Sequence, residues 1–238
     1  ILVDIDTSDQ QKACEYLYAS INAVAPSVRT VPIYDILKAN CDKEIFFKTD
    51  RNWTSLGAYY AYRQFCKIKM GIPVDLSKFK KEIYENFVGS FFKQSNEAES
   101  MGLGEILEVY VPQGNINVNI TDFNGEKSSG SLICDVTDYD EDMKFCAFLG
   151  GDYPYIEVNN KDIKDGSSCL LIKDSYGSVL APYLSLHYEN MYIIDYRYYD
   201  GDLNFLLGNV ELTDIIVENH IESTSDAETV SGIKQLFE

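Results

Sequence analysis

Hydrophobic residues recur at helical spacing in two stretches of the chain. After the capping-box pattern of residues 8–11, an apolar stripe runs to Pro26 and predicts a helix over residues 9–24. Thr54 is placed to cap a second helix, which Gly71 ends in the left-handed conformation. The apolar positions of the two helices are Cys14, Leu17, Ile21 and Val24, and then Leu56, Tyr59, Tyr62, Cys66 and Met70. Each helix is therefore expected to pack one face against a core.

Patterns typical of β-strands occupy much of the first two thirds. A short strand is predicted over residues 30–33 and a helical turn over 34–38, and an apolar run over 44–48 ends in the polar run of residues 49–52. From about residue 102 to 158 the runs EILEVYV, INVNITDF, GSLICDV and FCAFLGG are separated by Gly, Asn and Asp. These runs predict an antiparallel β subdomain inserted into the main fold.

Strands and helices alternate in the last third of the chain. Strands are predicted over residues 169–173, 191–195 and 214–218, and helices over 176–188, 203–207 and 227–237. This alternation is typical of parallel strands joined by right-handed crossovers. We therefore predict one domain, residues 1–238, with an α/β three-layer sandwich, a mainly parallel sheet and a β-rich insertion at about 102–158.

Charge and hydropathy exclude several classes of protein. The 38 acidic and 20 basic residues give a net charge of −18, which repels nucleic acid and anionic lipid, so neither is expected as a partner. No apolar run reaches the roughly 18 residues that span a bilayer. The chain opens on ILVDID without a signal segment, so we expect that any export signal was removed or lies upstream.

No metal or cofactor site is expected. The cysteines lack the CxxC or Cys/His spacing of zinc sites; they are Cys14, Cys41, Cys66, Cys134, Cys146 and Cys169. Their apolar contexts predict mostly buried free thiols, with disulfides as the alternative if the protein is exported. Residues 138–142 imitate the start of a calcium loop without its later Gly and Glu, so they are interpreted as a solvated acidic loop.

A candidate nucleophile follows the first strand of the alternating region. Asp174-Ser175-Tyr176-Gly177 lies between the strand CLLIK and a helix, a context that can expose a serine hydroxyl beside backbone N–H groups. By itself this pattern also fits an ordinary helix cap.

Two longer blocks carry a family resemblance. FFKTDRNWTSLGAYYAYRQFC resembles the DHHW family signature, and LLIKDSYGSVLAPYLSLHYENMYIIDYRYYD resembles the carboxyl-terminal block of the same family. With GSFFKQS and FLGGDYPY, the matching blocks extend from about residue 35 to 219. The family is similar to the SGNH hydrolases and to the bacterial alginate O-acetylation proteins. The resemblance implies an SGNH-like fold in which Asp50 orients, residue 52 acts as the base and Ser175 is the nucleophile.

The chain departs from the family pattern where the base is expected. Asn52 replaces the histidine, and Arg51 replaces the histidine before it. A serine hydroxyl needs a neighbouring group that accepts its proton, and an imidazole does this because its pKa is about 6.5. Asn52 can hydrogen-bond Ser175 but cannot take its proton. Loss of such a base costs several orders of magnitude in rate, although an oxyanion hole can preserve about 10³-fold over water.

Two histidines remain as substitutes. His187 lies about 10 residues along the helix that begins near Ser175, which places it about 15 Å away, so we interpret it as structural. His220 follows the strand DIIVE, and it emerges on the same rim as Ser175 if that strand is parallel to CLLIK. His220 is therefore a candidate base, with an exposed loop histidine as the alternative.

Substrate-binding candidates follow other strands. Gly150-Gly151-Asp152 resembles the Gly-Gly block of the family, where backbone N–H groups would face an oxyanion, although the Asp152 carboxylate would repel it. Trp53 and Arg51 flank Asn52. Tyr196, Arg197 and Tyr198 follow the strand MYIID and could stack against sugars, or alternatively pack against helices.

The resemblance supplies the functional expectation. It implies a degenerate SGNH-like esterase at the bacterial cell surface that engages an acylated polysaccharide or cell-wall glycan, with weak or absent hydrolysis. One alternative is a non-catalytic scaffold that binds a carbohydrate or a surface protein. The other is an active O-acetylesterase or acetyltransferase that uses His220 as its base.

Overall fold

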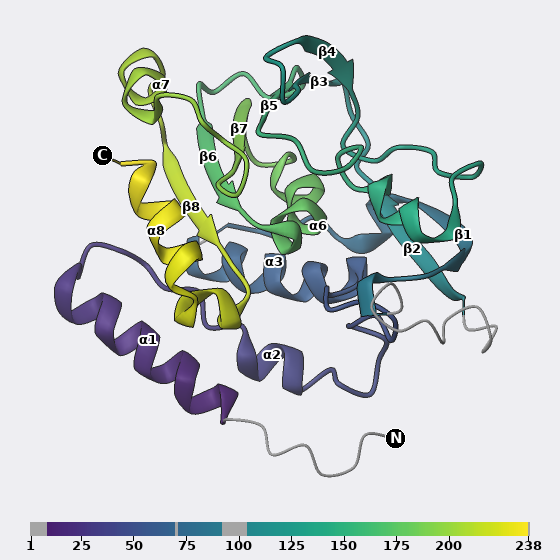
Figure 1. Ribbon diagram of the computed structural model, residues 1–238, viewed down its shortest axis with the longest axis horizontal. Coiled ribbons are helices and arrows are strands. Elements are labelled where there is room, and N and C mark those ends of the chain that lie inside the picture. Colours follow the sequence, from purple (N-terminus) through teal and green to yellow (C-terminus); the bar gives the residue numbers. More distant parts are fainter. Residues whose placement is uncertain (1–8, 70, 92–103, 238) are drawn as a thin grey trace.

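The structure, a computed structural model, describes residues 9–69, 71–91 and 104–237, in which helices cover both faces of a six-stranded sheet (Figure 1). The helices are α1 (Gln10–Val24), α2 (Tyr34–Lys38), α3 (Ser55–Lys69), α6 (Ser175–Leu184), α7 (Leu203–Asn209) and α8 (Ala227–Gln235). The strands are β1 (Lys80–Phe87), β2 (Glu105–Val111), β3 (Ile116–Thr121), β4 (Lys127–Gly130), β5 (Tyr155–Asn160), β6 (Ser168–Lys173), β7 (Asn190–Asp195) and β8 (Asp214–Glu218). Three short 3₁₀ helices are η1 (Leu76–Lys78), η2 (Glu141–Ala147) and η3 (Ile221–Ser225).

The main sheet has the strand order β4-β3-β5-β7-β6-β8 and mixed orientation. The predicted parallel strands are present, because β6 pairs in parallel with both β7 and β8. β3, β4 and β5 extend this sheet with antiparallel pairings rather than forming a β layer of their own. The physical reason is that Ile156 and Val158 alternate along β5 into the same core that the parallel strands cover. Among the described residues, only β1 and β2 form a separate two-stranded sheet, on the right in Figure 1.

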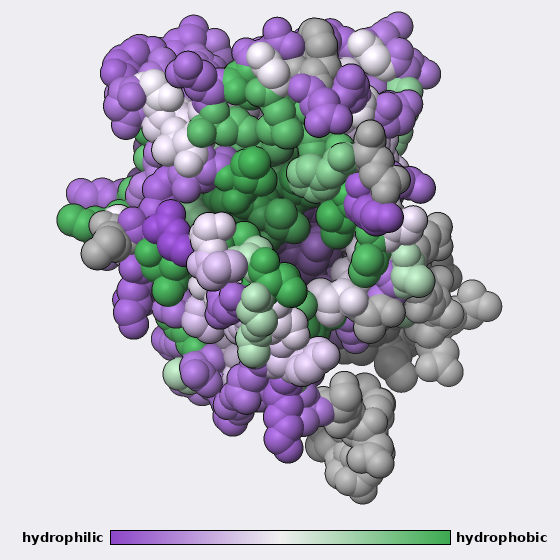
Figure 2. Space-filling view, turned by 90° about the vertical axis from the view of Figure 1, so that its left-hand side faces the viewer, coloured by the Kyte–Doolittle hydropathy of each residue, from purple (hydrophilic) through white to green (hydrophobic). Residues whose placement is uncertain are grey.

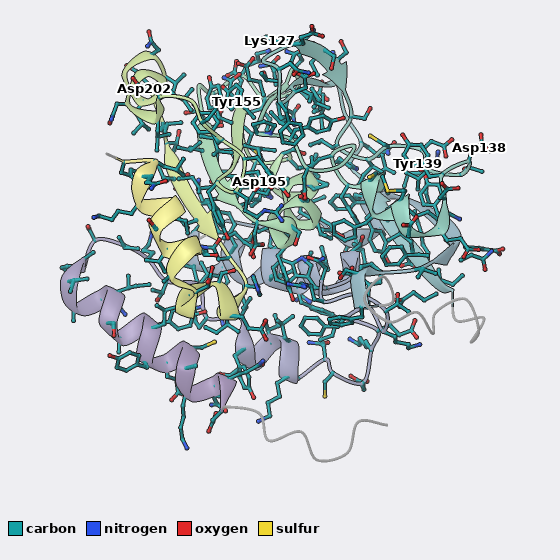
Figure 3. The ribbon with its side chains drawn as sticks, viewed as in Figure 1. Lys127, Asp138, Tyr139, Tyr155, Asp195 and Asp202 are labelled. Carbon is teal, nitrogen blue, oxygen red and sulfur yellow. The ribbon has the colours of Figure 1, made fainter. Side chains whose placement is uncertain are left out.

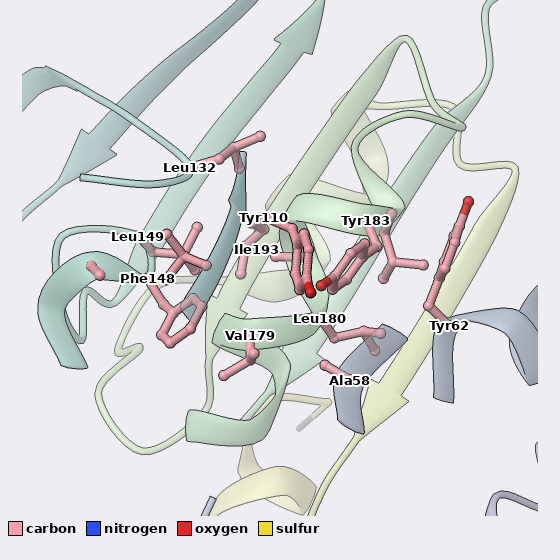
Figure 4. Close-up of a cluster of buried hydrophobic side chains, with 14 of the residues drawn as sticks. Ala58, Tyr62, Tyr110, Leu132, Phe148, Leu149, Val179, Leu180, Tyr183 and Ile193 are labelled. Carbon is pink, nitrogen blue, oxygen red and sulfur yellow. The ribbon is translucent and has the colours of Figure 1, made fainter. Parts of the chain in front are cut away.

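The larger core lies between the sheet and the helices α3 and α6. Val179, Leu180 and Tyr183 of α6 and Ala58 of α3 meet the strand residue Ile193, and Figure 4 shows these side chains together. The Tyr183 hydroxyl donates a hydrogen bond to the Ser55 carbonyl at 2.8 Å, so its buried polar tip is satisfied. The opposite face of the sheet is covered by α7 and α8 through Leu203, Leu236 and neighbouring apolar residues. The sheet is therefore buried on both faces at its centre, as the all-buried strand β6 requires.

Local differences from the sequence-based expectations have local causes. Asp9 caps α1, because its side chain accepts a hydrogen bond from the Lys12 amide at 3.1 Å, and Ser8 lies outside the described residues. Residues 30–33 form no strand. Residues 44–48 make a single bridge, between Phe46 and Trp53, and turn back instead of joining a sheet.

The predicted end of α3 is present, whereas the end of α6 and two predicted strand runs differ from the structure. Gly71 does close α3, since its amide donates to the Cys66 carbonyl at 2.8 Å. α6 ends at Leu184, four residues before the predicted end at residue 188. The run FCAFL belongs to η2 and the turn after it, and GSLICDV contributes only the bridge between Ile133 and Phe148.

One side of the molecule exposes apolar surface. Figure 2 shows it between polar regions on the side of α1, α7 and α8. β8 is an edge strand that pairs only with β6 among the described residues, and its outward side chains Ile215 and Val217 are about half exposed. Within the described part of the chain, no helix combines the length and the apolar character that crossing a membrane requires. All six cysteines are free thiols, of which Cys66 and Cys169 are buried and Cys41 is exposed.

Candidate active site

The strand register defines one rim of the sheet. Thr121, Tyr155, Ile194, Ile172 and Val217 are aligned in a row by the pairings of β3, β5, β7, β6 and β8. Four of these strands end at or one residue beyond this row, and the antiparallel β5 begins there. Ligands of α/β sheets collect beyond the carboxyl ends of parallel strands, so this rim is the place for a site.

Ser175 lies on this rim as the first residue of α6. Asp174 is the residue that caps the helix, because its side chain accepts a hydrogen bond from the Tyr176 amide at 2.9 Å. Ser175 is half-buried, and its hydroxyl has no hydrogen-bond partner among the described residues. The capping function therefore falls to Asp174 and leaves the Ser175 hydroxyl available.

Asp50 holds the Asn52 side chain in a fixed orientation. The Asp50 Oδ1 atom accepts hydrogen bonds from the Asn52 Nδ2 at 2.6 Å and from the Asn52 amide at 2.8 Å. Its Oδ2 atom accepts from the Ser90 amide at 2.8 Å. Gly89 permits this close approach, since a Cβ atom there would lie 2.3 Å from the Asp50 Cβ. Asp50 and Asn52 are both buried, at 6% and 5% exposure.

The segment that bears Asn52 is tied directly to the start of α6. The Trp53 Nε1 donates a hydrogen bond to the Tyr176 carbonyl at 3.0 Å, and the two rings pack edge to face with centroids 5.2 Å apart. The Tyr176 hydroxyl in turn donates to the Arg51 carbonyl. The residues on both sides of Asn52 therefore contact the residue next to Ser175. Trp53 is buried and the Arg51 side chain is exposed, so Trp53 acts in packing and Arg51 faces solvent.

The Asn52 side-chain amide can donate a hydrogen bond to Asp50, as an imidazole would, but it cannot act as a base. Its nitrogen donates to Asp50, as a histidine N–H would, and this leaves its oxygen as an acceptor. The Asn52 Oδ1 atom is buried without a hydrogen-bond partner in the described structure. It can therefore accept a hydrogen bond from a hydroxyl or from a ligand, but a neutral carboxamide does not take up the proton.

A second polar pair lies on the other side of the rim. The Asp174 Oδ2 atom accepts a hydrogen bond from the His220 Nδ1 at 2.8 Å and another from the His220 amide at 3.0 Å. The His220 ring also stacks on Tyr176, with centroids 5.6 Å apart and an interplanar angle of 5°. Burial acts to raise the pKa of Asp174, but the His220 hydrogen bonds outweigh it and the pKa is lowered. His220 thus reaches the same rim as Ser175, with its Nδ1 held by a carboxylate.

Glu218 adds a third carboxyl group behind this pair. It ends β8, and its Oε2 atom is buried without a hydrogen-bond partner in the described structure. Gly177 of α6 packs onto it, because a Cβ there would lie 3.0 Å from that oxygen and 2.4 Å from the Lys173 Cβ. Burial and then the charge of Asp174 raise the pKa of Glu218 well above its ordinary value, although Lys173 opposes this. The surroundings of Glu218 therefore favour its protonated form, whereas those of Asp174 favour its charged form.

The raised pKa of Glu218 gives a prediction of how stability depends on pH. A carboxyl group with a raised folded-state pKa binds more protons in the folded than in the unfolded chain, so stability falls as pH rises from about 4.5 toward the folded pKa. Glu218→Gln should remove this slope, which is up to about 1.4 kcal/mol per pH unit, and raise the free energy of unfolding at pH 7. Denaturant titrations between pH 4 and 8 measure it. The exposed Glu222→Gln serves as the control, and parallel curves for wild type and Glu218→Gln would refute the assignment.

The rim also contains a buried ion network. The Lys173 Nζ lies 2.8 Å from the Asp195 Oδ2 and 2.9 Å from the Ser178 Oγ, and both Lys173 and Asp195 are fully buried. Arg197 binds Asp195 through two hydrogen bonds, at 2.6 and 2.8 Å, and binds Asp152 at 3.0 Å. Burial acts to raise the pKa of Asp195, but Arg197 and Lys173 outweigh it and the pKa is lowered. The Asp152 charge is thus offset by Arg197.

The glycine turn before Asp152 differs from the expected strand end. It follows η2, and Leu149, Gly150 and Gly151 have φ values of 60°, 79° and 119°. The Gly151 amide donates to the Phe148 carbonyl at 3.1 Å, so this donor is already engaged within the turn. Gly151 therefore shapes the turn that carries Asp152 to Arg197.

The tyrosines after β7 divide into two groups. Tyr196 is buried at 7% exposure among apolar residues of β6, β7, α7 and α8, so it packs against the core. Tyr198 is 41% exposed, and the Arg197 guanidinium carbon lies 5.0 Å from its ring centroid. Tyr196 therefore packs against helices, which was the alternative to sugar stacking. Tyr198 is exposed to solvent.

Sequence reasoning interpreted His187 as a structural residue of the helix after Ser175, although α6 ends at Leu184, and it missed three carboxyl groups. The His187 Nε2 lies 2.5 Å from the Tyr62 hydroxyl, which makes His187 part of the α3–α6 packing. Asp174, Asp195 and Glu218 were not selected as site residues. Each one is a carboxyl residue at or just after the end of a strand on this rim, and that position was the signal available in the sequence.

An α/β sheet of mixed orientation whose strand-to-helix turn presents Ser175 defines an SGNH-like fold. The chain belongs to the DHHW family, because the family model described as DHHW protein matches residues 2–194. The crystal structure of a DHHW family protein from Eubacterium siraeum is similar, with 25% identity and a TM-score of 0.79 over 92% of this chain and 73% of that one.

Two further solved structures match the chain at lower identity. Bacillus cereus PatB1, in a structure with a sulfonyl adduct, has 18% identity and a TM-score of 0.72 over 91% of this chain and 76% of that one. The O-acetyltransferase domain of Pseudomonas putida AlgJ has 13% identity and a TM-score of 0.46 over 97% of this chain and 75% of that one. No protein sequence with a curated description matches the chain.

Proposed function

We propose that this protein binds an acyl group of an acylated glycan at the Ser175 rim and hydrolyses it weakly or not at all. The observation that carries the proposal is the Asp50–Asn52 hydrogen bond of 2.6 Å, which leaves the buried Asn52 oxygen unpartnered. This arrangement keeps an oriented acceptor beside the start of α6 but supplies no base. Family membership and the SGNH-like fold support the acyl chemistry, and the name of the AlgJ domain describes an O-acetyltransferase.

The location and partners belong to the same proposal. A polysaccharide or cell-wall glycan is the partner that an acyl-glycan site requires, and it would be met at the cell surface or outside the cell. A net charge of −18 makes nucleic acid an unfavourable partner. A scaffold that binds a surface protein would use the same rim without any covalent step.

A second candidate function is supported by the Asp174–His220 pair. A carboxylate that accepts from the Nδ1 of a histidine fixes the tautomer whose Nε2 is a base. In that function the Ser175 hydroxyl would give its proton to His220 and form an ester bond to the acyl carbon as the sugar oxygen leaves. The sugar oxygen would regain the proton from His220. Water in an esterase, or a second sugar hydroxyl in a transferase, would then give its proton to His220 and bond to the acyl carbon, and the acyl group would leave Ser175 as the serine oxygen regains the proton. The protein would be an active O-acetylesterase or acetyltransferase.

Labelling with a sulfonyl fluoride separates the two functions, and the sulfonyl adduct of PatB1 makes this reagent a fitting probe. We expect intact-mass spectrometry to show that wild type is labelled no faster than Ser175→Ala, because the hydroxyl has no base. Labelling of wild type at Ser175 that disappears in His220→Ala would replace the first function by the second. His187→Ala is the matched control, since His187 lies in the α3–α6 packing.

A further inference from the structure

An exposed aromatic pair occupies the same rim, away from Ser175. Phe123 follows β3 and is 64% exposed, and Tyr198 follows β7 and is 41% exposed. Their rings are perpendicular, at 87°, with centroids 5.5 Å apart. Two segments that are far apart in sequence therefore combine two aromatic rings that face solvent. Aromatic rings that are open to solvent offer apolar faces on which a ligand can pack.

The backbone around Phe123 holds the ring outward. The Asp122 Oδ1 accepts hydrogen bonds from the Asn124 amide at 2.9 Å and from the Glu126 amide at 2.8 Å. Gly125 supplies the φ of 78° that closes this turn. The Phe123 ring thus lies on a turn that the polar residues of the turn stabilise. Phe123 itself contributes little to the core.

Tyr198 is fixed from the other side. The Arg197 guanidinium carbon lies 5.0 Å from the Tyr198 ring centroid, and Arg197 is anchored by Asp195 and Asp152. The same network continues through Asp195 to Lys173, two residues before Ser175. A continuous chain of side-chain contacts therefore joins Tyr198 to the end of β6.

The register sets the separation between the pair and Ser175. β7 is the neighbour of β6, and β3 is three strands away from β6 in the order β3-β5-β7-β6. At about 4.8 Å per strand, Phe123 lies on the order of 14 Å along the rim from the end of β6. A ligand that reaches both places is longer than one sugar ring, so an oligosaccharide fits and a small ester does not.

The charges beside the pair select the kind of sugar. Asp122 and Glu126 flank Phe123, and Asp200 and Asp202 follow Tyr198. The nearby cations are engaged, since Arg197 binds Asp195 and Asp152, and the Lys127 Nζ lies 3.7 Å from the Glu157 carboxylate. An acidic polysaccharide would meet net negative charge here. A neutral pyranose ring carries no charge, so the carboxylates do not repel it. Its apolar face can pack on the aromatic rings, and its hydroxyls can donate hydrogen bonds to the carboxylates.

We propose that Phe123 and Tyr198 form a stacking platform for a neutral sugar residue of a glycan whose acylated part lies at Ser175. The platform rests on the proposed function for the identity of the ligand as a glycan. It adds the substrate class, a neutral hexopyranose oligosaccharide rather than a polyuronate, and the subsite that recognises it.

Calorimetric titration of the whole chain with three hexasaccharides tests the platform. The probes are the hexamers of glucose, of N-acetylglucosamine and of a uronic acid. We expect at least one neutral hexamer to bind and the uronic acid hexamer to bind at least tenfold more weakly. Phe123→Ala and Tyr198→Ala should each weaken the neutral hexamer about tenfold, which is the size of one aromatic contact.

The controls separate this inference from the proposed function. Tyr139→Ala removes another exposed tyrosine, and Figure 3 places Tyr139 toward the right edge of the molecule, away from Tyr155 of β5, so binding should not change. Circular dichroism confirms that the exposed-residue variants fold. The platform is refuted if no hexamer binds, if the uronic acid hexamer binds as tightly as the neutral ones, or if Phe123→Ala binds like wild type. Labelling of wild-type Ser175 would overturn only the weak-hydrolysis function, since binding at the platform does not depend on it.

Discussion

Asn52→His should raise the turnover of an aryl acetate by about 10²–10⁴-fold over wild type, which is the usual contribution of a positioned general base. The Asp50 Oδ1 already accepts from the Asn52 Nδ2 at 2.6 Å, so a histidine N–H has its partner in place. The other imidazole nitrogen would then replace the unpartnered Asn52 oxygen as an acceptor that can also take the proton. The rate should rise with pH as the imidazole loses its proton near its ordinary pKa of about 6.5.

Two variants check that the gain comes from this arrangement. The double variant Asn52→His with Ser175→Ala should show no gain, because the nucleophile is absent. Asp50→Asn in the Asn52→His background should lose most of the gain, because the imidazole loses the carboxylate that orients it. A wild type that already turns over at the rate of Asn52→His, and that His220→Ala inactivates, would show that the chain uses the Asp174–His220 pair instead.

Asp195→Ala should lower the free energy of unfolding by about 3–5 kcal/mol, the loss typical of a buried charge that is left without its partner. Lys173 is fully buried, and after the substitution its remaining charged neighbour is Asp152, at 3.9 Å. Urea titration at pH 7 measures the change. Asp195→Asn preserves the side-chain shape and gives a second value if the alanine variant does not fold.

Arg197→Ala is the matched control for the ion network. The Arg197 side chain is 32% exposed, and Asp195 retains Lys173 at 2.8 Å when Arg197 is removed, so the loss should be clearly smaller. The stability that this network contributes also depends on pH. Because the pKa of Asp195 is lowered in the folded chain, its contribution is present at neutral pH and is lost as pH falls through the folded pKa. Equal losses in Asp195→Ala and Arg197→Ala would contradict a dominant Lys173–Asp195 pair.

The sequence located the helices and strands whose pattern is locally complete. α3 was predicted from Thr54 because its periodic apolar face, capping residue and terminal glycine all lie within one stretch. β6, β7 and β8 were predicted because each is short and apolar and is separated from the next by a helix. The SGNH-like architecture followed from that alternation together with the family resemblance.

The β-rich segment shows where local pattern is insufficient. The alternation of β3 and β5 is the same whether these strands form a separate layer or extend an existing sheet. The choice depends on pairing between β5 and β7, whose residues are far apart in sequence. The sheet is therefore mixed rather than mainly parallel, and the antiparallel β5 brings Asp152 to the rim of Ser175.

By itself the sequence determined that Ser175 follows a buried strand and opens a helix, and that Asn52 stands where the family has its histidine. Those facts depend on neighbours along the chain and on motif spacing. Only the tertiary structure decided which distant side chains meet at the rim, namely His220 with Asp174, and Phe123 with Tyr198. The physical reason is that hydrogen bonds and ring contacts act over a few ångströms, and the pairing of the strands brings these segments, which are far apart in sequence, within that distance.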